Sequence, residues 1–126
     1  MRIDHVGLYV ADLESAKAFF EKFFEATSNS MYHNPRTGLR TYFLTFPDGG
    51  RLELLQRDGV VAVGKSDAVA SVHVSLSVGS KERVDALAKQ LDAAGFAVLD
   101  GPRTTGDGYY EASISGPERL RIEVTA

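Results

Sequence analysis

The sequence contains two copies of one pattern, in which a short alternating segment is followed by an amphipathic segment and then by three further strand-like segments. The first copy spans about residues 1–57, the second spans about residues 71–126, and a linker lies at about 58–70. One copy alone would leave a face of its sheet uncovered, so duplicated modules of this kind pair to complete a shared structure. We therefore predict one α+β domain, residues 1–126, in which two tandem βαβββ modules curve their mixed sheets around a common cleft.

The alternating segments, 3–10 and 71–78, each predict a strand with one apolar face. Asp12 and Ser80 follow them at positions suited to a helix N-cap, and Gly95 is placed to end the second helix. Turn residues separate the remaining strand-like segments. These strands are predicted at 27–32, 39–46 and 51–56 in the first copy, and at 97–100, 108–115 and 120–124 in the second.

Composition excludes several classes of protein and site. The chain of 126 residues has 14 basic and 17 acidic side chains, and its basic residues are scattered, which argues against a nucleic-acid partner or an anionic membrane surface. No segment approaches the ~20 apolar residues of a membrane span, so we expect a cytoplasmic protein. The sequence has no cysteine, and any metal must therefore be held by His, Asp and Glu.

Two histidines and two glutamates recur at matching positions of the two copies. His5 and His73 lie on the first strand of each copy (73 − 5 = 68), and Glu53 and Glu123 lie on the last strand (123 − 53 = 70). Strand alternation points each glutamate away from the apolar residues beside it. We therefore expect the four side chains to face the cleft and to converge on one point.

Two imidazole nitrogens and two carboxylate oxygens form a suitable ligand set for one divalent ion per site, such as zinc, nickel, cobalt, manganese or iron. This set leaves one or two positions for water or substrate, which is typical of a catalytic metal site. A cation would also offset the repulsion between two inward-facing carboxylates. His33 has no counterpart in the second copy, and we interpret it as a loop histidine without a metal role.

Four other side chains are candidates for binding a small-molecule substrate. Tyr9 shares the predicted face of His5. Arg36 and Arg40 flank a glycine in a predicted loop, where a guanidinium group could bind a carboxylate. Tyr110 alternates with the preceding tyrosine on one strand, so one of these two side chains is expected to reach the cleft.

Several segments resemble the vicinal oxygen chelate superfamily, the group of glyoxalase I, fosfomycin-resistance proteins, bleomycin-binding proteins and extradiol dioxygenases. The similarity covers essentially the whole chain. Residues 101–111 are similar to small bacterial glyoxalase-like proteins, whereas the turn at 115–119 departs from the one that relatives often have. The resemblance is carried by residues 3–16 (IDHVGLYVADLESA), 50–54 (GRLEL), 72–76 (VHVSL) and 121–124 (RIEV).

The resemblance implies a divalent metal held by His5, Glu53, His73 and Glu123. It also implies a homodimer, because sites of the glyoxalase I type commonly form between two chains. The sequence leaves open whether the site lies within one chain or is shared.

The activity that the resemblance implies is that of a glyoxalase-like lyase or isomerase. Such an enzyme would act on a small α-oxo compound or its thiol conjugate, with Glu123 as the base and Glu53 as its symmetric partner. The alternative is an antibiotic-resistance protein of the fosfomycin-modifying or bleomycin-binding type. An extradiol-type dioxygenase is disfavoured, because such sites usually use two His and one carboxylate.

Overall fold

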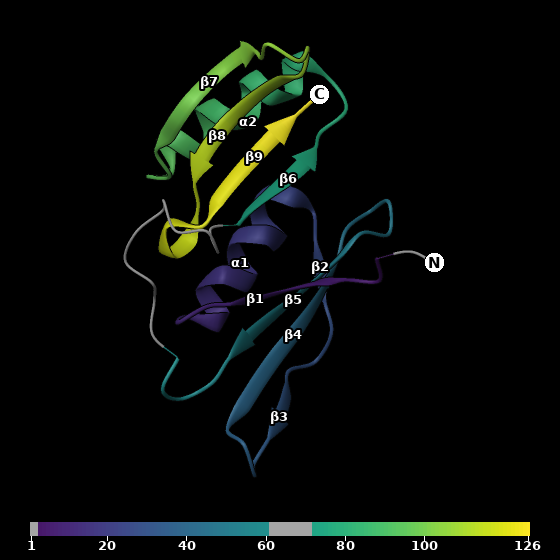
Figure 1. Cartoon of the computed structure of the whole chain (residues 1–126), viewed down its shortest axis with the longest axis vertical. Helices are drawn as coiled ribbons and strands as arrows, with labels where there is room; N and C mark the ends of the chain where they lie inside the picture. Colours follow the sequence, from purple (N-terminus) through teal and green to yellow (C-terminus); the bar gives the residue numbers. More distant parts are fainter. Residues whose placement is uncertain (1–2, 61–71) are drawn as a thin grey trace. The chain divides into compact units, whose positions relative to one another are not determined.

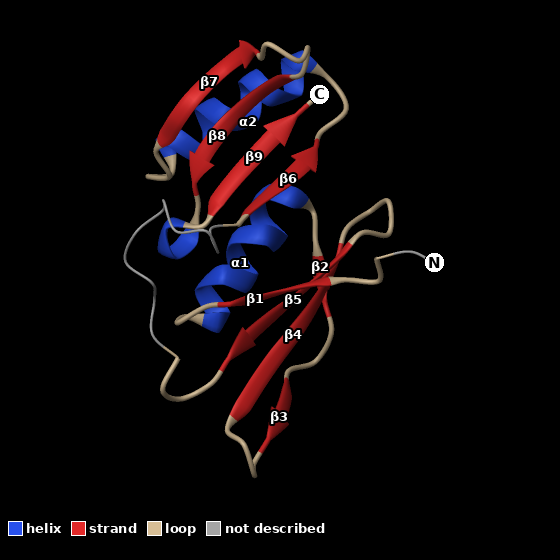
Figure 2. Cartoon of the chain, viewed as in Figure 1, coloured by secondary structure: helices blue, strands red, loops and turns tan. Residues whose placement is uncertain are grey.

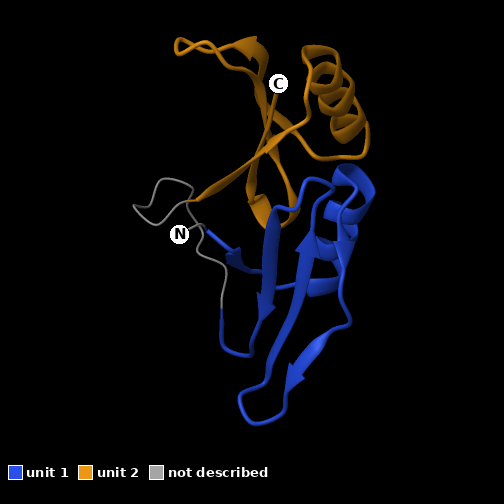
Figure 3. Ribbon diagram, turned by 90° about the vertical axis from the view of Figure 1, so that its right-hand side faces the viewer, with its two compact units in different colours: residues 1–64 blue, residues 65–126 orange. Residues whose placement is uncertain are grey.

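The computed structural model describes residues 3–60 and 72–126. The chain forms two compact units, Met1–Gly64 and Lys65–Ala126, which Figure 3 shows in different colours. Most of the predicted linker, 58–70, lies outside the described residues. Each unit is a mixed sheet with one long helix, so the predicted α+β class and the two tandem βαβββ modules are confirmed.

The first unit contains five strands and one helix in the described residues (Figure 1). The sheet order is β1-β5-β4-β2, with β3 also paired to β4; β1 and β5 are parallel and the other pairs are antiparallel. The elements are β1 (Val6–Tyr9), α1 (Leu13–Phe24), β2 (Thr27–Ser28), β3 (Tyr32–Asn34), β4 (Leu39–Thr45) and β5 (Arg51–Gln56).

The second unit repeats this plan with the sheet order β6-β9-β8-β7. Its first and last strands, β6 and β9, are parallel, as β1 and β5 are in the first unit. A short 3₁₀ turn at Pro117–Arg119 precedes the last strand. The elements are β6 (His73–Ser77), α2 (Lys81–Ala93), β7 (Val98–Thr104), β8 (Tyr110–Ser115) and β9 (Arg121–Thr125).

In each unit the long helix covers one face of the sheet (Figure 2). The buried core of each unit therefore lies between the helix and the alternate strand residues that face it. In the first unit the buried residues include Phe19, Phe20, Leu44, Leu52 and Leu54. In the second unit they include Val84, Leu91, Ile114, Ile122 and Val124.

The helix ends follow the predicted capping signals. The side chain of Asp12 accepts a hydrogen bond from the backbone N–H of Ser15, and that of Ser80 accepts one from the N–H of Arg83. Gly95, just after α2, has a positive φ of 90°, which suits glycine at a helix end. No helix of the described residues is long and apolar enough to cross a membrane.

One predicted strand, 27–32, is divided into β2 and β3 in the structure. Asn29 lies between them, and its side-chain oxygen accepts a hydrogen bond of 2.8 Å from the backbone N–H of Phe43 in β4. This side-chain contact takes the place of a backbone ladder bond. The prediction of one continuous strand was therefore wrong.

Strand β7 is longer than the predicted segment 97–100. It continues through Pro102, which a strand can accommodate because β7 lies at the edge of its sheet. Its pairing with β8 shifts register twice, between Val98 and Asp100 and between Asp100 and Arg103, as expected for an irregular edge strand.

Gly101→Ala is expected to lower the free energy of unfolding by at least about 2 kcal/mol. Gly101 has a φ of +81°, and a Cβ there would lie 2.5 Å from the backbone oxygen of Glu111. Gly106→Ala is the matched control, because a Cβ added at Gly106 would meet no atom within 4 Å beyond its chain neighbours. Urea denaturation of both variants measures the difference, and equal stability would contradict this role of Gly101.

Candidate functional site

The last strand of each unit carries one glutamate between two buried apolar residues. Glu53 lies between Leu52 and Leu54, which are 5% and 0% exposed. Glu123 lies between two residues of β9 that are fully buried beneath α2. Because strand side chains alternate, both glutamates project from the face of their sheet opposite the helix, here called the helix-free face. This agrees with the orientation predicted from the sequence.

In the first unit, His5 lies beside Glu53 on the helix-free face. His5 directly precedes β1, and its Nε2 atom is 3.6 Å from Oε2 of Glu53. The His5 ring meets the Phe43 ring edge-on at a centroid distance of 5.0 Å. The Glu53 side chain is 20% exposed and that of His5 is 36% exposed, so both remain accessible to a small ligand.

The second unit contains the equivalent pair. Nε2 of His73, the first residue of β6, lies 3.2 Å from Oε2 of Glu123. The other carboxylate oxygen of Glu123, Oε1, lies 3.6 Å from Nε of Arg121. The two oxygens of this carboxylate therefore face different partners. Oε2 is the one directed at the imidazole.

These pairs have the chemistry and spacing of neighbouring metal ligands. With metal–ligand bonds of about 2.1 Å, adjacent donors lie about 3.0 Å apart in an octahedral shell and about 3.4 Å apart in a tetrahedral shell. The observed separations of 3.6 and 3.2 Å are close to these values. Each pair offers one imidazole nitrogen and one carboxylate oxygen, which suits a borderline divalent ion. Each module thus contains one imidazole–carboxylate pair with the separation of neighbouring ligands.

The structure brings the predicted ligands together as two pairs, one within each unit. Among residues 3–60 and 72–126, no group of three or more His, Asp and Glu side chains is close enough to hold an ion. Convergence of both pairs on one ion therefore stays a prediction. His33, on β3, pairs with Arg40 of β4 in the sheet register and belongs to neither His–Glu pair.

Three charged residues beside the pairs were missed by the sequence interpretation. Arg51 and Arg121 each precede a glutamate by two residues, so alternation places them on the same face as that glutamate. The Asp4 carboxylate accepts a hydrogen bond of 2.9 Å from Nδ1 of His5 and one of 3.1 Å from Arg51. The repeat contained the signal for both arginines, since 121 − 51 = 70 is also the spacing of the two glutamates.

The two candidate tyrosines lie on different faces. Tyr9 of β1 is 52% exposed and shares the helix-free face, because it pairs with the residue two positions after Glu53. Tyr110 of β8 instead donates a hydrogen bond of 2.7 Å to Asp85 of α2, and this bond raises the pKa of Tyr110. Tyr110 therefore lies on the helix side of its sheet, away from Glu123, and this placement does not support a substrate contact.

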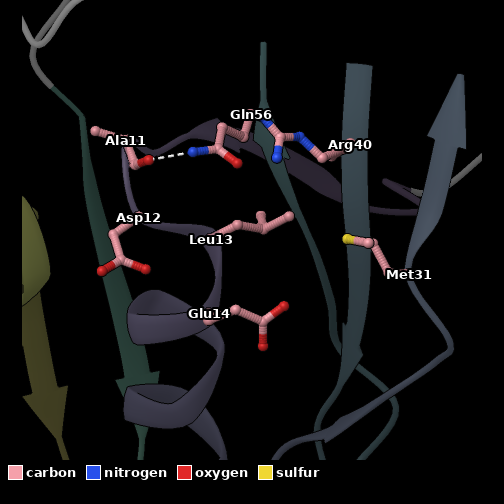
Figure 4. A pocket seen from close by; sticks show the side chains of 7 residues that line it. All are labelled: Ala11, Asp12, Leu13, Glu14, Met31, Arg40 and Gln56. Atoms are coloured by element: carbon pink, nitrogen blue, oxygen red, sulfur yellow. Dashed lines mark hydrogen bonds between the residues drawn. The ribbon is translucent and has the colours of Figure 1, made fainter. Parts of the chain in front are cut away.

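The two candidate arginines also occupy different positions. Arg36 is exposed in the turn between β3 and β4. Arg40 lies within β4, as the strand predicted at 39–46 implies, and not in a loop, and it forms an ion pair of 3.6 Å with Asp58. It lines a cavity of about 410 Å³ beside the start of α1, together with Gln56 and Met31 (Figure 4). This cavity lies on the helix side and contains neither His5 nor Glu53.

The chain is similar to known proteins over nearly its whole length. A family model described as the glyoxalase/bleomycin resistance protein/dioxygenase superfamily matches residues 2–124. The uncharacterized protein YqjT of Bacillus subtilis is 26% identical, over 97% of this chain and 96% of that protein. The structure of a possible glyoxalase from Bacillus cereus is 26% identical, with a TM-score of 0.72 over 100% of this chain and 99% of that one. The fosfomycin resistance protein FosX of Listeria monocytogenes, solved with Mn(II) and sulfate, is 16% identical, with a TM-score of 0.73 over 99% and 91% of the chains.

Proposed function

Because the chain belongs to the glyoxalase/bleomycin resistance protein/dioxygenase superfamily, we propose that it is a divalent-metal-dependent enzyme of the glyoxalase-like lyase or isomerase type. The observation that carries the proposal is the repeated His–Glu pair. His5 with Glu53 and His73 with Glu123 present the same two donor types, 3.6 and 3.2 Å apart, on the helix-free face of each module. Two unrelated surface pairs would have no reason to match in both sequence spacing and orientation.

The proposed ligands of the ion are His5, Glu53, His73 and Glu123, two from each module. A bound divalent cation would act as a Lewis acid on two neighbouring oxygens of a substrate. The FosX structure with Mn(II) supports a metal role for this fold, and the four proposed ligands suit zinc, nickel, cobalt, manganese or iron. We further propose that the protein acts as a homodimer.

Glu123 is the proposed base, and Glu53 is its symmetric partner. A carboxylate that removes a proton from carbon and returns it to the neighbouring atom needs one oxygen directed at the substrate and a fixed orientation. Glu123 is 14% exposed, and Arg121 faces one of its two oxygens. The partly buried carboxylate is therefore both accessible and oriented.

The proposed substrate is a small α-oxo compound or its thiol conjugate. Two neighbouring oxygens would satisfy the open positions of the ligand set, and Tyr9 shares the face on which the substrate would lie. Fosfomycin modification is the alternative that the fold likeness to FosX brings forward. The two reactions differ in product, so one assay series can separate them.

The test is elemental analysis of protein expressed without a metal-binding tag, followed by a substrate screen. About one equivalent of a divalent metal per site is expected, together with conversion of methylglyoxal in the presence of one of several thiols, measured by NMR. Protein that stays metal-free after addition of nickel, zinc or manganese would overturn the proposal. Consumption of fosfomycin without conversion of any α-oxo compound would select the alternative.

A further inference from the structure

The two modules hold an arginine at the same place but use it differently. Arg121 is the register partner of His73, and in the first unit Arg51 and His5 each directly precede a residue of the register pair Val6–Leu52. Arg51 donates a hydrogen bond to Asp4, which in turn accepts one from His5. Arg121 instead lies beside Glu123, with 3.6 Å between Nε and Oε1. Arg51 therefore contacts the carboxylate that binds the histidine of its pair, whereas Arg121 lies beside the glutamate of its pair.

The His5 ring is contacted by Asp4 and by Phe43. Nδ1 donates to Oδ2 of Asp4 at 2.9 Å, and the Phe43 ring lies edge-on at 5.0 Å. The Arg51 guanidinium lies over the same Phe43 ring, 4.6 Å from its centroid, while it also bonds to Asp4. A proton held on Nδ1 leaves the lone pair on Nε2, the atom that faces Glu53. This is the tautomer that a metal ligand bound through Nε2 requires.

Arg121 contacts different groups from those that Arg51 contacts. Its Nη2 atom donates a hydrogen bond of 3.0 Å to the hydroxyl of Ser113, which is 2% exposed. Ser113 and Glu123 are direct register partners in adjacent strands. In the first unit the register partner of Glu53 is Phe43, over which Arg51 stacks. The replacement of a phenylalanine by a serine gives Arg121 a polar anchor close to its carboxylate.

We propose that Arg51 and Arg121 are positioning residues with different targets. Arg51 acts through Asp4 to hold the His5 imidazole as the Nδ1–H tautomer, and Arg121, anchored by Ser113, holds Oε1 of Glu123 so that Oε2 faces His73. The assignment of His5 and Glu123 as metal ligands rests on the proposed function, whereas the orientation of the two side chains does not depend on it. Outer contacts of this kind typically change metal affinity by about 10- to 100-fold when removed.

The test uses two spectral probes and three variants of the metal-free, full-length chain. The probes are the imidazole ¹⁵N resonances of His5, assigned with His5→Ala, and the side-chain carboxyl ¹³C resonance of Glu123, assigned with Glu123→Gln. Spectra are recorded at pH 8.5, where an ordinary imidazole is neutral. Asp4→Ala and Arg51→Ala are expected to remove the Nδ1–H preference of His5 and to leave Glu123 unchanged. Arg121→Ala is expected to shift Glu123 and to leave His5 unchanged.

An Asp4→Asn variant serves as the conservative rescue, because its amide oxygen still accepts a hydrogen bond from Nδ1 of His5. It is expected to keep the His5 tautomer. Unchanged His5 resonances in Asp4→Ala, or a shift of His5 rather than Glu123 in Arg121→Ala, would overturn the inference. Calorimetric titration with Mn²⁺ then measures the expected 10- to 100-fold loss of affinity in Asp4→Ala and Arg121→Ala. If the wild-type protein binds no ion, the proposed function fails, whereas the spectral result still decides the inference.

Discussion

Glu123→Gln is expected to lower turnover by about 10²- to 10⁴-fold, the usual contribution of a positioned general base, while the protein keeps its metal. The amide that replaces the carboxylate cannot accept a substrate proton at neutral pH, but its oxygen atom can still bind a cation as an uncharged ligand. Glu123 is 14% exposed, and the substitution preserves its volume. A large change in folding is therefore not expected.

Glu53→Gln is the matched control, because Glu53 occupies the equivalent position of the other module. It is expected to lower turnover by less than about tenfold if Glu123 alone moves the proton. Initial rates on the substrate identified in the screen, together with metal content, measure both effects. Wild-type turnover in Glu123→Gln would show that the assigned base is wrong. A larger loss in Glu53→Gln than in Glu123→Gln would show that the two roles are exchanged.

The sequence predicts well the fold and the face of the sheet on which Glu53 and Glu123 lie, because both depend on local periodicity. Alternation around Glu53 and Glu123 follows from the period of a strand, whatever the rest of the chain does. The caps at Asp12 and Ser80 depend on backbone groups within three residues. Matching offsets in a duplicated chain then identify equivalent residues without any knowledge of their contacts.

The differences from the prediction arise where a side chain or an edge position overrides the local pattern. Asn29 ends β2 by bonding to the backbone of Phe43, a contact 14 residues away in the sequence. Pro102 normally argues against a strand, but β7 is an edge strand and tolerates it. Tyr110 lies toward α2, where Asp85, 25 residues away in the sequence, accepts a hydrogen bond from its hydroxyl group. None of these partners can be identified from spacing alone.

The roles of Arg51 and Arg121 show a further limit of sequence symmetry. Equal spacing predicts equal placement, and the structure bears this out for both side chains. Their partners differ because Phe43 and Ser113 occupy equivalent register positions in the two modules. An aromatic face favours a stacked guanidinium, whereas a buried hydroxyl favours a hydrogen bond. The repeat therefore identifies which residues to compare, and the neighbouring strand determines what each one does.

Removal of either histidine is expected to abolish measurable metal binding at micromolar ion concentrations. His5→Ala and His73→Ala each leave an incomplete ligand set of three donors, and a loss of more than about 100-fold in affinity is expected because even outer contacts contribute 10- to 100-fold. His33→Ala is the control variant, since His33 lies outside both His–Glu pairs, and it is expected to bind like the wild type. Calorimetric titration with Mn²⁺ or Ni²⁺ measures all three.

A mixture of His5→Ala and His73→Ala chains tests whether the metal site is shared between two chains. If one His–Glu pair comes from each chain of a homodimer, a mixed dimer of His5→Ala and His73→Ala chains contains one site with two intact pairs and one site with two damaged pairs. Random mixing after refolding together would then restore about a quarter of the wild-type sites. A site built within one chain stays damaged in every combination, and no metal binding returns. Recovery of about a quarter of the sites is the result expected for the proposed homodimer, and its absence would place both pairs around an ion in a single chain.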